Sequence, residues 1–303
     1  MEESAPQPKI TALILSYNSA PALRRCLAAL EGSQGREQLE IIVVDCGSVD
    51  ESPALDHEFP GVTILRLERN FGATKALNIG MRTAAADYVL FLAPEVVVEP
   101  NTVQALVARL DADESAGAVC PLLVDEAGRP QTEFSRLPSP AGMGLLWRDP
   151  ESLPHVTVDP TAEAVPVEYP GRAALAARKY FIKAINWFDD RYGEFGGDLE
   201  LAYQLWRSRK KILVVPSIRA TLMEGAPLAL DTAALATLRA DRAHGVSVFL
   251  AKHFGWFAGL LFKVKAIFYT LGQLVTFQEP GFQFRLLTAL LSGQKIDGSQ
   301  RTL

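Results

Sequence analysis

The first candidate site for chemistry is a short polar run that follows an apolar one. Residues 41–44 are apolar and mostly β-branched, which predicts a strand buried on both faces, and Asp45, Gly47, Ser48 and Asp50 come directly after them. In open α/β sheets, ligands bind in the crevice outside the carboxyl ends of the strands. We therefore expect Asp45 to project into a ligand crevice and Asp50 to lie on the connection that leaves it.

The same run has a simpler interpretation as an ordinary turn between a strand and a helix. In that case Asp45 would accept hydrogen bonds from the amides of its own loop, and Ser52 would cap the next helix. This stretch taken alone favours the ordinary turn over the ligand site, and the rest of the chain shifts the preference toward the ligand site.

Composition excludes several classes of protein. The chain has 303 residues and a formal net charge of −5, so it is long enough for a substantial core and has no general basic surface for nucleic acid. Its three cysteines lie far apart, without metal or redox spacing, which indicates reduced thiols in a cytosolic protein. Residues 1–9 are polar and lack the apolar core of a signal peptide, so we expect a disordered tail there.

Strands and helices alternate over the first hundred residues. This order predicts an α/β fold with a parallel sheet and right-handed crossovers. Ser19 is a candidate N-cap for the first helix, and Pro21 suits its first turn. The expected strands cover 11–16, 41–44, 62–67 and 88–92, and the expected helices cover 20–30, 74–86 and 101–110.

A dinucleotide-binding Rossmann domain is the first α/β candidate to test. It requires Gly-x-Gly-x-x-Gly after the first strand, so that a pyrophosphate can approach a helix N-terminus. The corresponding residues here are Tyr17-Asn18-Ser19-Ala20-Pro21, which include no glycine. The Rossmann interpretation is therefore rejected.

The second half of the chain is less regular. Residues 125–170 are rich in proline, glycine and polar residues, which predicts loops that shape a substrate mouth. After a small apolar run at 173–177, the sequence Phe188-Asp-Asp-Arg-Tyr leads to Asp198, a helix over 199–209 and a strand over 212–216.

Residues 231–303 are predicted to be helical, with a dense apolar and aromatic set between 246 and 277. Lysines interrupt this set, and charges near the centre of a membrane-spanning helix are costly. An interfacial helix with aromatic and lysine anchors fits the pattern better. A helical hairpin packed on the preceding domain remains the alternative.

Several separate runs agree in order with a known family. They are Ser-Tyr-Asn-Ser after the first strand, Ile-Val-Val-Asp-x-Gly-Ser-x-Asp, Asn-x-Gly-x-x-x-x-x-Asn-x-Gly, Tyr-Val-Leu-Phe-Leu before an acidic turn, and Phe-Asp-Asp-x-Tyr ahead of an aspartate. Over about residues 10–225 the chain resembles the family 2 glycosyltransferases of the GT-A fold, particularly the rhamnosyltransferase-like branch. The resemblance implies a mostly parallel sheet flanked by helices over 10–230, followed by a C-terminal helical extension.

The resemblance also implies roles for individual residues. Tyr17 matches the residue that packs on the nucleobase, and Asp45 matches the acid that bonds the edge of the base. Asp198 matches the catalytic base, which takes the acceptor hydroxyl's proton while the bond to the nucleoside diphosphate breaks. The alternative role for Asp198 is an N-cap of the helix over 199–209. The other matched nucleotide-site residues are Gly47, Ser48, Asp50, Asn70, Gly72 and Asn78.

Four positions depart from the family pattern. The metal-binding turn is Ala93-Pro94-Glu95, so Glu95 is left as the candidate ligand of a weakened Mg²⁺ or Mn²⁺ site. The acid before the expected base is replaced by Gly197, and no histidine occurs near Leu222. In the first motif Cys46 and Glu51 replace the usual asparagine and glycine. Lys75, Arg172 and Arg178 are alternative candidates for binding the diphosphate.

These observations predict an inverting, hexosyl-type glycosyltransferase of polysaccharide and cell-envelope synthesis. It would use a nucleotide-sugar donor and a glycan or lipid-linked acceptor in the cytoplasm, at the inner membrane surface. The alternative is a degenerate GT-A domain that binds a nucleotide or a partner protein without catalysis. Nucleic acid is not an expected partner.

Overall fold

The structure, a computed structural model, describes residues 8–140, 153–224 and 230–298. Residues 1–7 of the expected N-terminal tail therefore lie outside the described residues. Lys9 belongs to the folded part, because its Nζ forms an ion pair with Asp111 Oδ2 at 2.8 Å.

The helices and strands follow the alternation that the sequence predicts, with additional short strands in the second half. The first half contains β1 (Ile10–Ser16), α1 (Ala20–Glu31), a 3-10 turn (Arg36–Gln38), β2 (Leu39–Asp45), a second 3-10 turn (Ser52–His57), β3 (Val62–Arg66), α2 (Ala73–Thr83), β4 (Tyr88–Leu92), β5 (Val96–Val98), α3 (Thr102–Ala112) and β6 (Ala116–Val124). The second half contains β7 (Glu133–Ser135), β8 (His155–Thr157), β9 (Val165–Val167), β10 (Ala174–Arg178), α4 (Lys179–Ala184), α5 (Gly197–Arg207), β11 (Lys211–Leu222), α6 (Thr232–Phe254), α7 (Trp256–Val275) and α8 (Pro280–Ser292).

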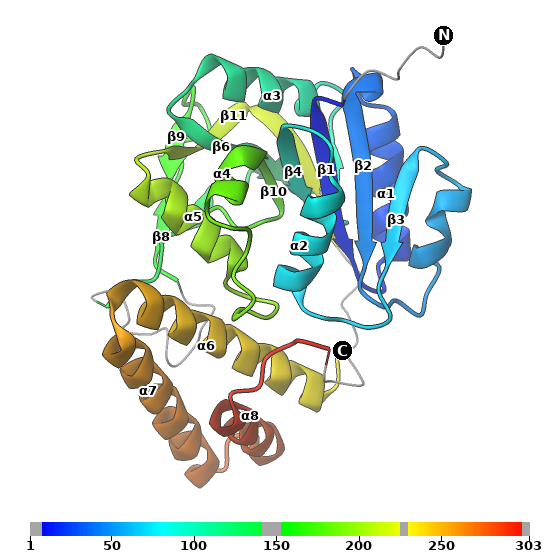
Figure 1. The fold of residues 1–303 in the computed structure, drawn as a ribbon. Coiled ribbons are helices and arrows are strands. Elements are labelled where there is room, and N and C mark those ends of the chain that lie inside the picture. The colour runs from blue at the N-terminus through cyan, green and yellow to red at the C-terminus, as the bar shows by residue number, and fades with distance from the viewer. Residues whose placement is uncertain (1–7, 141–152, 225–229, 299–303) are drawn as a thin grey trace.

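One mixed, mostly parallel sheet of nine strands organises the described residues (Figure 1). Its order is β3-β2-β1-β4-β10-β6-β11-β5, and β9 pairs with β11. Strands β3, β2, β1 and β4 are mutually parallel, whereas β10 runs antiparallel between β4 and β6. The carboxyl ends of β1, β2 and β4 therefore meet the start of β10 at one edge of the sheet.

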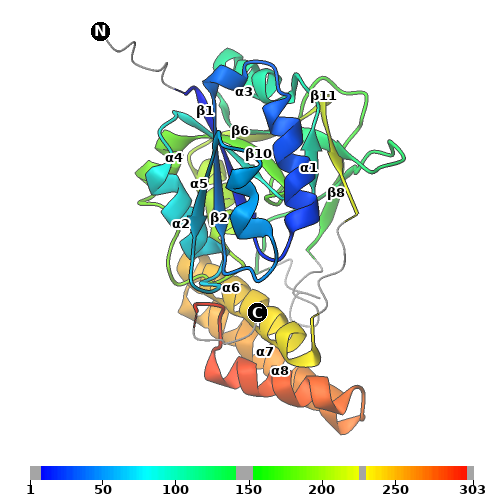
Figure 2. The same cartoon turned by 90° about the vertical axis from the view of Figure 1, so that its right-hand side faces the viewer.

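Apolar side chains fill both faces of this sheet. On one face α1 and α3 bury Leu23, Leu27 and Leu106 against the strands. On the other face α2 and α5 contribute Leu77 and Leu205 to a second core, which continues into the C-terminal helices. Figure 2 shows the sheet between these helical layers. The strands carry apolar side chains on both faces, as the β-branched runs predict.

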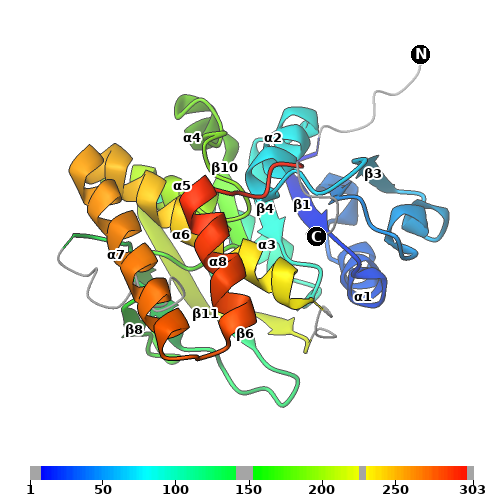
Figure 3. The ribbon, with the colours of Figure 1, turned by 90° about the horizontal axis from the view of Figure 1, so that it is seen from below.

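The C-terminal helices α6, α7 and α8 pack against one another below the sheet (Figures 1 and 3). Helix α6 also packs on the sheet domain, where Phe249 is fully buried and His253 Nε2 lies 2.7 Å from Glu200 Oε2 of α5. Helix α7 is the one helix in the described part of the chain that is long and apolar enough to cross a membrane. Helix α6 therefore packs on the preceding domain, as the hairpin alternative expects, whereas most of α7 lies outside the core.

Several predicted element boundaries are wrong. The helix expected over 74–86 ends at Thr83, where the Ala85 amide donates instead to Glu40 Oε2 at 2.9 Å. The helix expected over 199–209 is α5, which begins at Gly197 because Gly196 turns the chain with φ of 117°. The strand expected over 212–216 is the longer β11, which continues through an irregularity between Val215 and Arg219.

Candidate active site

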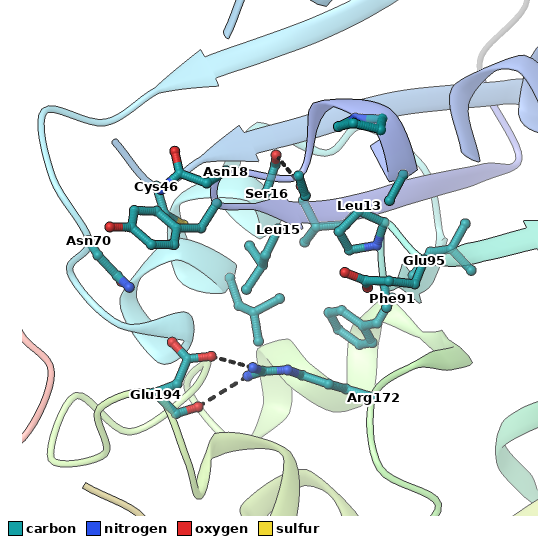
Figure 4. Close-up of a pocket in the computed structure, with 18 of the residues that line it drawn as sticks. Leu13, Leu15, Ser16, Asn18, Cys46, Asn70, Phe91, Glu95, Arg172 and Glu194 are labelled. Carbon is teal, nitrogen blue, oxygen red and sulfur yellow. Dashed lines mark hydrogen bonds and ion pairs between the residues drawn. The ribbon is translucent and has the colours of Figure 1, made fainter. Parts of the chain in front are cut away.

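The main cavity of the described residues lies at the edge where β1, β2 and β4 end and β10 begins. Its volume is about 820 Å³. Figure 4 shows Ser16, Asn18 and Cys46 on one side and Arg172 with Glu194 on the other. Leu13, Leu15, Leu77 and Phe91 supply apolar surface between the two sides. The cavity therefore occupies the crevice that the sequence predicts, and its size suits a ligand larger than a monosaccharide.

Of the predicted site residues, Tyr17, Asn70 and Glu95 line this cavity directly. Burial raises the pKa of the Tyr17 hydroxyl, so its ring stays neutral at physiological pH. Asn70 Oδ1 accepts the Gly72 amide at 2.8 Å, which closes the turn that leads into α2. An aromatic face and a side-chain amide are suitable partners for a planar base.

Asp45 is almost completely buried, beside the cavity-lining residues Ser16 and Cys46. Its Oδ2 accepts the amides of Gly47 and Ser48 at 3.2 and 3.1 Å, so the turn interpretation holds for this oxygen. Its Oδ1 is buried without a hydrogen-bond partner among the described residues. Asp45 itself is not among the residues that line the cavity, so in this structure it does not project into the crevice as expected.

Asp50 and Ser52 hold the first loop rather than line the cavity. Asp50 Oδ2 accepts the Ala20 amide at 2.9 Å, and Ser52 Oγ accepts the Ser19 amide at 3.2 Å. Ser19 occupies the N-cap position of α1 as predicted, but its side chain makes no capping hydrogen bond, because its hydroxyl pairs with Ser16 Oγ and Asp50 accepts the Ala20 amide instead. Partial burial raises the pKa of Asp50, but hydrogen bonds from Ala20 and Ser52 lower it below its usual value.

The predicted glycines act through close packing between loops. A Cβ on Gly47 would lie 2.6 Å from the Arg69 Cα, and one on Gly72 would lie 2.4 Å from the Ile296 carbonyl oxygen. Ser48 Oγ accepts the amide of Asn18 at 2.9 Å. These residues bring the first loop, the second loop and the C-terminal segment together around the cavity.

Asn78 is turned away from the cavity. Its side chain bonds both backbone groups of Phe188, accepting the amide at 2.9 Å and donating to the carbonyl at 2.9 Å. It also donates to Asp190 Oδ1 at 3.1 Å. Asn78 therefore positions the loop before α5, and the resemblance alone assigns it to a nucleotide pocket.

Two carboxylates line the cavity at the turn Ala93-Pro94-Glu95 and at the segment beside it. Glu95 lines it from the turn, and Glu224 lines it from the end of β11, where the Met223 amide donates to the Glu95 carbonyl at 2.9 Å. No group of three potential metal ligands occurs among residues 8–140, 153–224 and 230–298. Mg²⁺ commonly takes one or two protein carboxylates and completes its shell with phosphate and water, so Glu95 and Glu224 fit a cation shared with a diphosphate.

Arg172 lies next to this turn in the sheet register, because the Ala93 amide donates to the carbonyl of the adjacent Ala173 at 2.8 Å. Its guanidinium pairs with the Glu194 carboxylate and donates to the Glu194 carbonyl at 3.1 Å (Figure 4). Arg178 lies elsewhere, bonded to the Leu110 carbonyl, and Lys75 stands 4.3 Å from the Phe71 ring centre. Arg172 alone of these three lines the cavity.

Asp198 lies in the first turn of α5 and is half-buried beside the Arg172–Glu194 ion pair. Its Oδ2 accepts the Tyr169 hydroxyl at 2.6 Å, and its Oδ1 contacts the Leu199 amide at 3.0 Å. Helix α5 begins at Gly197, with Gly196 at its N-cap position. The alternative prediction, that Asp198 is the N-cap of this helix, is therefore wrong. The contacts with Tyr169 and Leu199 fix the orientation of the Asp198 carboxylate, which is not itself among the residues that line the cavity.

Two residues that line the cavity come from the C-terminal unit and were not predicted from the sequence. Leu238 of α6 and Ile296, beyond α8, both contribute to its wall. Glu194 was also missed, although it lies in the acidic run before α5 that carries Asp198. Cys46 lines the cavity as a buried thiol, and burial raises its pKa to about 12, so it is not a nucleophile at neutral pH.

The comparisons with known proteins concern the family and the fold of the chain. The sequence model of "Glycosyl transferase family 2" matches residues 11–161. The N-acetylglucosaminyl-diphospho-decaprenol L-rhamnosyltransferase of Mycobacterium tuberculosis is 26% identical over 222 residues, which are 67% of this chain and 72% of that protein. The succinoglycan biosynthesis protein ExoO of Rhizobium meliloti is 31% identical over 139 residues, which are 43% of this chain and 40% of that protein.

A solved structure has the same fold across nearly the whole chain. The mannosyltransferase PcManGT from Pyrobaculum calidifontis, in complex with GDP-Man and Mn²⁺, superposes with a TM-score of 0.56 at 17% identity. The match covers 95% of this chain and 86% of that one. Fold, motif order and family match point to one conclusion: the chain belongs to glycosyl transferase family 2, with a GT-A-type fold.

Proposed function

We propose that this protein is an inverting glycosyltransferase that transfers a hexosyl-type sugar from a nucleoside-diphosphate donor to a lipid-linked or polysaccharide acceptor. The observation that carries the proposal is the cavity of about 820 Å³ at the strand ends, which is lined by Tyr17, Asn70, Glu95 and Arg172. Tyr17 would pack against the nucleobase, and a shift of the first loop on binding would expose the unpartnered Asp45 Oδ1 to an imide or amino N–H on the edge of the base.

Different residues would bind the nucleoside and the diphosphate of the donor. The nucleoside would lie near Tyr17, Asp45 and Asn70, which leaves the diphosphate near Glu95 and Arg172. A divalent cation held by Glu95 and Glu224 would supply charge stabilisation to the leaving diphosphate. In the free enzyme the Arg172 guanidinium is paired with Glu194, so its charge is not left unpaired. When the donor binds, the same guanidinium can also bond a phosphate oxygen.

Asp198 is the proposed catalytic base. As the acceptor hydroxyl oxygen forms its bond to the anomeric carbon, the bond from that carbon to the diphosphate oxygen breaks and the electron pair leaves with the diphosphate. Asp198 takes the hydroxyl proton in the same step. Tyr169 remains a hydrogen-bond donor throughout, because burial and the neighbouring Asp198 raise the pKa of its hydroxyl well above the usual range.

The C-terminal helices and the relatives support the proposed acceptor class. Helices α7 and α8 expose large apolar side chains, among them Trp256, Phe257, Phe268 and Phe284. Between residues 256 and 295 the charged residues are Lys263, Lys265, Arg285 and Lys295 against the single acid Glu279. An aromatic, cationic face suits an anionic lipid surface, so we place the enzyme at the inner face of the cytoplasmic membrane, where a lipid-linked acceptor is available.

Calorimetric titration with UDP, dTDP and GDP, each with and without Mn²⁺, tests the donor site. We expect one of these nucleotides to bind and Mn²⁺ to tighten its binding. Binding to none of them by the folded protein would overturn the proposal.

Binding without transfer is the outcome that the degenerate-domain alternative predicts. Gly197 at the position of the family's acid favours that alternative. A panel of nucleotide sugars, with lipid-linked and oligosaccharide acceptors in Mn²⁺, separates the two. Release of nucleoside diphosphate that depends on an acceptor supports the transferase, and binding with no turnover of any donor would reject it.

A further inference from the structure

The segment that follows α8 turns back to the sheet domain and reaches the cavity. In Figures 1 and 3 it runs from the end of α8 toward α2, passing close to α6. Ile296 is almost completely buried and lines the cavity. Lys295 Nζ donates to the Asp190 carbonyl at 2.7 Å, and Arg69 Nη1 donates to the Gly298 carbonyl at 2.8 Å. Residues 294–298, which we name the return segment, are thus fastened on both sides of Ile296.

A single buried carboxylate joins the return segment to the loop that carries Glu194. Asp241 of α6 is fully buried, and its Oδ1 accepts the Ile296 amide at 2.8 Å and the Glu194 amide at 3.2 Å. Its Oδ2 accepts the Phe195 amide at 2.9 Å. The two residues that Oδ1 holds, Ile296 and Glu194, both line the cavity.

Backbone packing leaves no room between these segments. A Cβ on Gly72 would lie 2.4 Å from the Ile296 carbonyl oxygen, and one on Gly193 would lie 2.0 Å from Asp241 Oδ1. The Thr74 amide donates to the Gly193 carbonyl at 3.1 Å, which links the start of α2 to the same cluster. The loop that carries Asn70 therefore packs against both the return segment and the loop that carries Glu194.

We propose that the return segment is part of the donor site, in which Ile296 forms the apolar wall against the nucleoside and Asp241 is the residue that positions it. The inference rests on the proposed donor site, because it assigns the nucleoside to the end of the cavity that contains Asn70. The C-terminal unit is then required for nucleotide binding itself. Leu238 of α6, which also lines the cavity, extends the same apolar wall.

The test compares two apolar truncations in the same C-terminal unit of the full chain. Ile296→Ala truncates a residue that lines the cavity, whereas Leu286→Ala truncates a similarly buried residue of α8 that does not line it. Both variants lose core packing. Only Ile296→Ala should weaken binding of the nucleoside diphosphate, by roughly 5- to 30-fold, as expected for the loss of a few buried methylene contacts. Ile296→Val should bind almost as tightly as the wild type.

Each outcome can be separated from failure of the proposed function. Calorimetry with the nucleoside diphosphate that binds best, together with thermal unfolding of all four proteins, provides the readout. Equal affinity of wild type and Ile296→Ala would overturn the inference and leave the donor site standing. An equal loss of affinity in Leu286→Ala would also overturn it, because a general loosening of the unit would then explain both losses. Absence of binding by the wild type would instead reject the proposed function.

Discussion

The Tyr169 hydroxyl donates a hydrogen bond to Asp198 Oδ2 at 2.6 Å and thereby orients the carboxylate at the start of α5. The two residues come from different parts of the fold, since Tyr169 precedes β10 and Asp198 belongs to the first helical turn after the Phe188 loop. The pairing gives the proposed base a defined direction, although Gly197 replaces the acid that the family usually has beside it.

Asp198→Asn should abolish transfer while the protein stays folded. The amide cannot accept the acceptor's proton, and loss of a general base typically lowers the rate by roughly 100- to 10,000-fold. Transfer rates and thermal unfolding would be measured together, with Asp113→Asn, at the opposite end of the sheet, as the matched control. An unimpaired Asp198→Asn enzyme would remove Asp198 from the mechanism.

Tyr169→Phe should lower the turnover number by roughly 5- to 50-fold and leave donor affinity close to that of the wild type. The substitution removes one charge-assisted hydrogen bond, of about 1.5–3 kcal/mol, that orients the base without contacting the nucleotide. Steady-state kinetics separates the two effects. A large rise in KM for the donor with unchanged turnover would contradict the orienting role.

Glu95→Gln and Glu224→Gln should each raise the Mn²⁺ concentration needed for half-maximal nucleotide binding. Each substitution replaces an anionic ligand by a neutral one, and a loss of about tenfold is expected from one hard oxygen ligand. Titration of Mn²⁺ at fixed nucleotide measures the change, and Glu133→Gln is a control on β7, outside the cavity lining. Nucleotide binding by the wild type that is identical with Mn²⁺ and with a chelator would show that the two carboxylates hold no cation.

The contribution of Asp241 to the free energy of unfolding should fall as pH rises through the pKa of its carboxyl group. Burial raises its pKa from 3.8 to about 6, so the folded state binds this proton more tightly than the unfolded chain does. The contribution of this group to stability is therefore greatest below about pH 4 and declines by about 3 kcal/mol as pH rises past 6. Urea unfolding of wild type and Asp241→Asn at several pH values isolates it. Parallel stability curves for the two proteins would refute the assignment.

Substitution of the exposed aromatics of α7 should release the protein from anionic vesicles. Phe257→Glu with Phe268→Glu introduces two charges on a face where these rings are 61% and 69% exposed, so folding should be little affected. Vesicle flotation should then show at least a tenfold weaker partition. Trp206→Glu, on the sheet domain, is the control for a single exposed aromatic. Truncation before Val246 is unsuitable, because it would remove the fully buried Phe249 from the core. Equal flotation of wild type and the double variant would defeat the membrane assignment.

The parts of the fold that could be predicted are those with local periodicity. The β-branched run ending at Asp45 and the helical spacing of Leu23 and Leu27 locate a strand and a helix without any knowledge of their neighbours. The short strands β5, β7 and β9, of three residues each, have no such period. Helix ends were misplaced where a distant group, such as Glu40 beside Ala85, competes for the terminal amides.

The sequence by itself determined the α/β alternation, the polar run after the second strand and the order of motifs that identifies the family. These features are readable because each depends on residues close together in the chain. Only the tertiary structure decided that Asp50 caps α1, that Arg172 pairs with Glu194 and that Ile296 lines the cavity. Each of those contacts joins residues far apart in sequence, for instance Asp241 and Ile296 at a separation of 55 positions. No spacing rule reports such a contact, because it exists only once the sheet edge, α6 and the return segment have packed together.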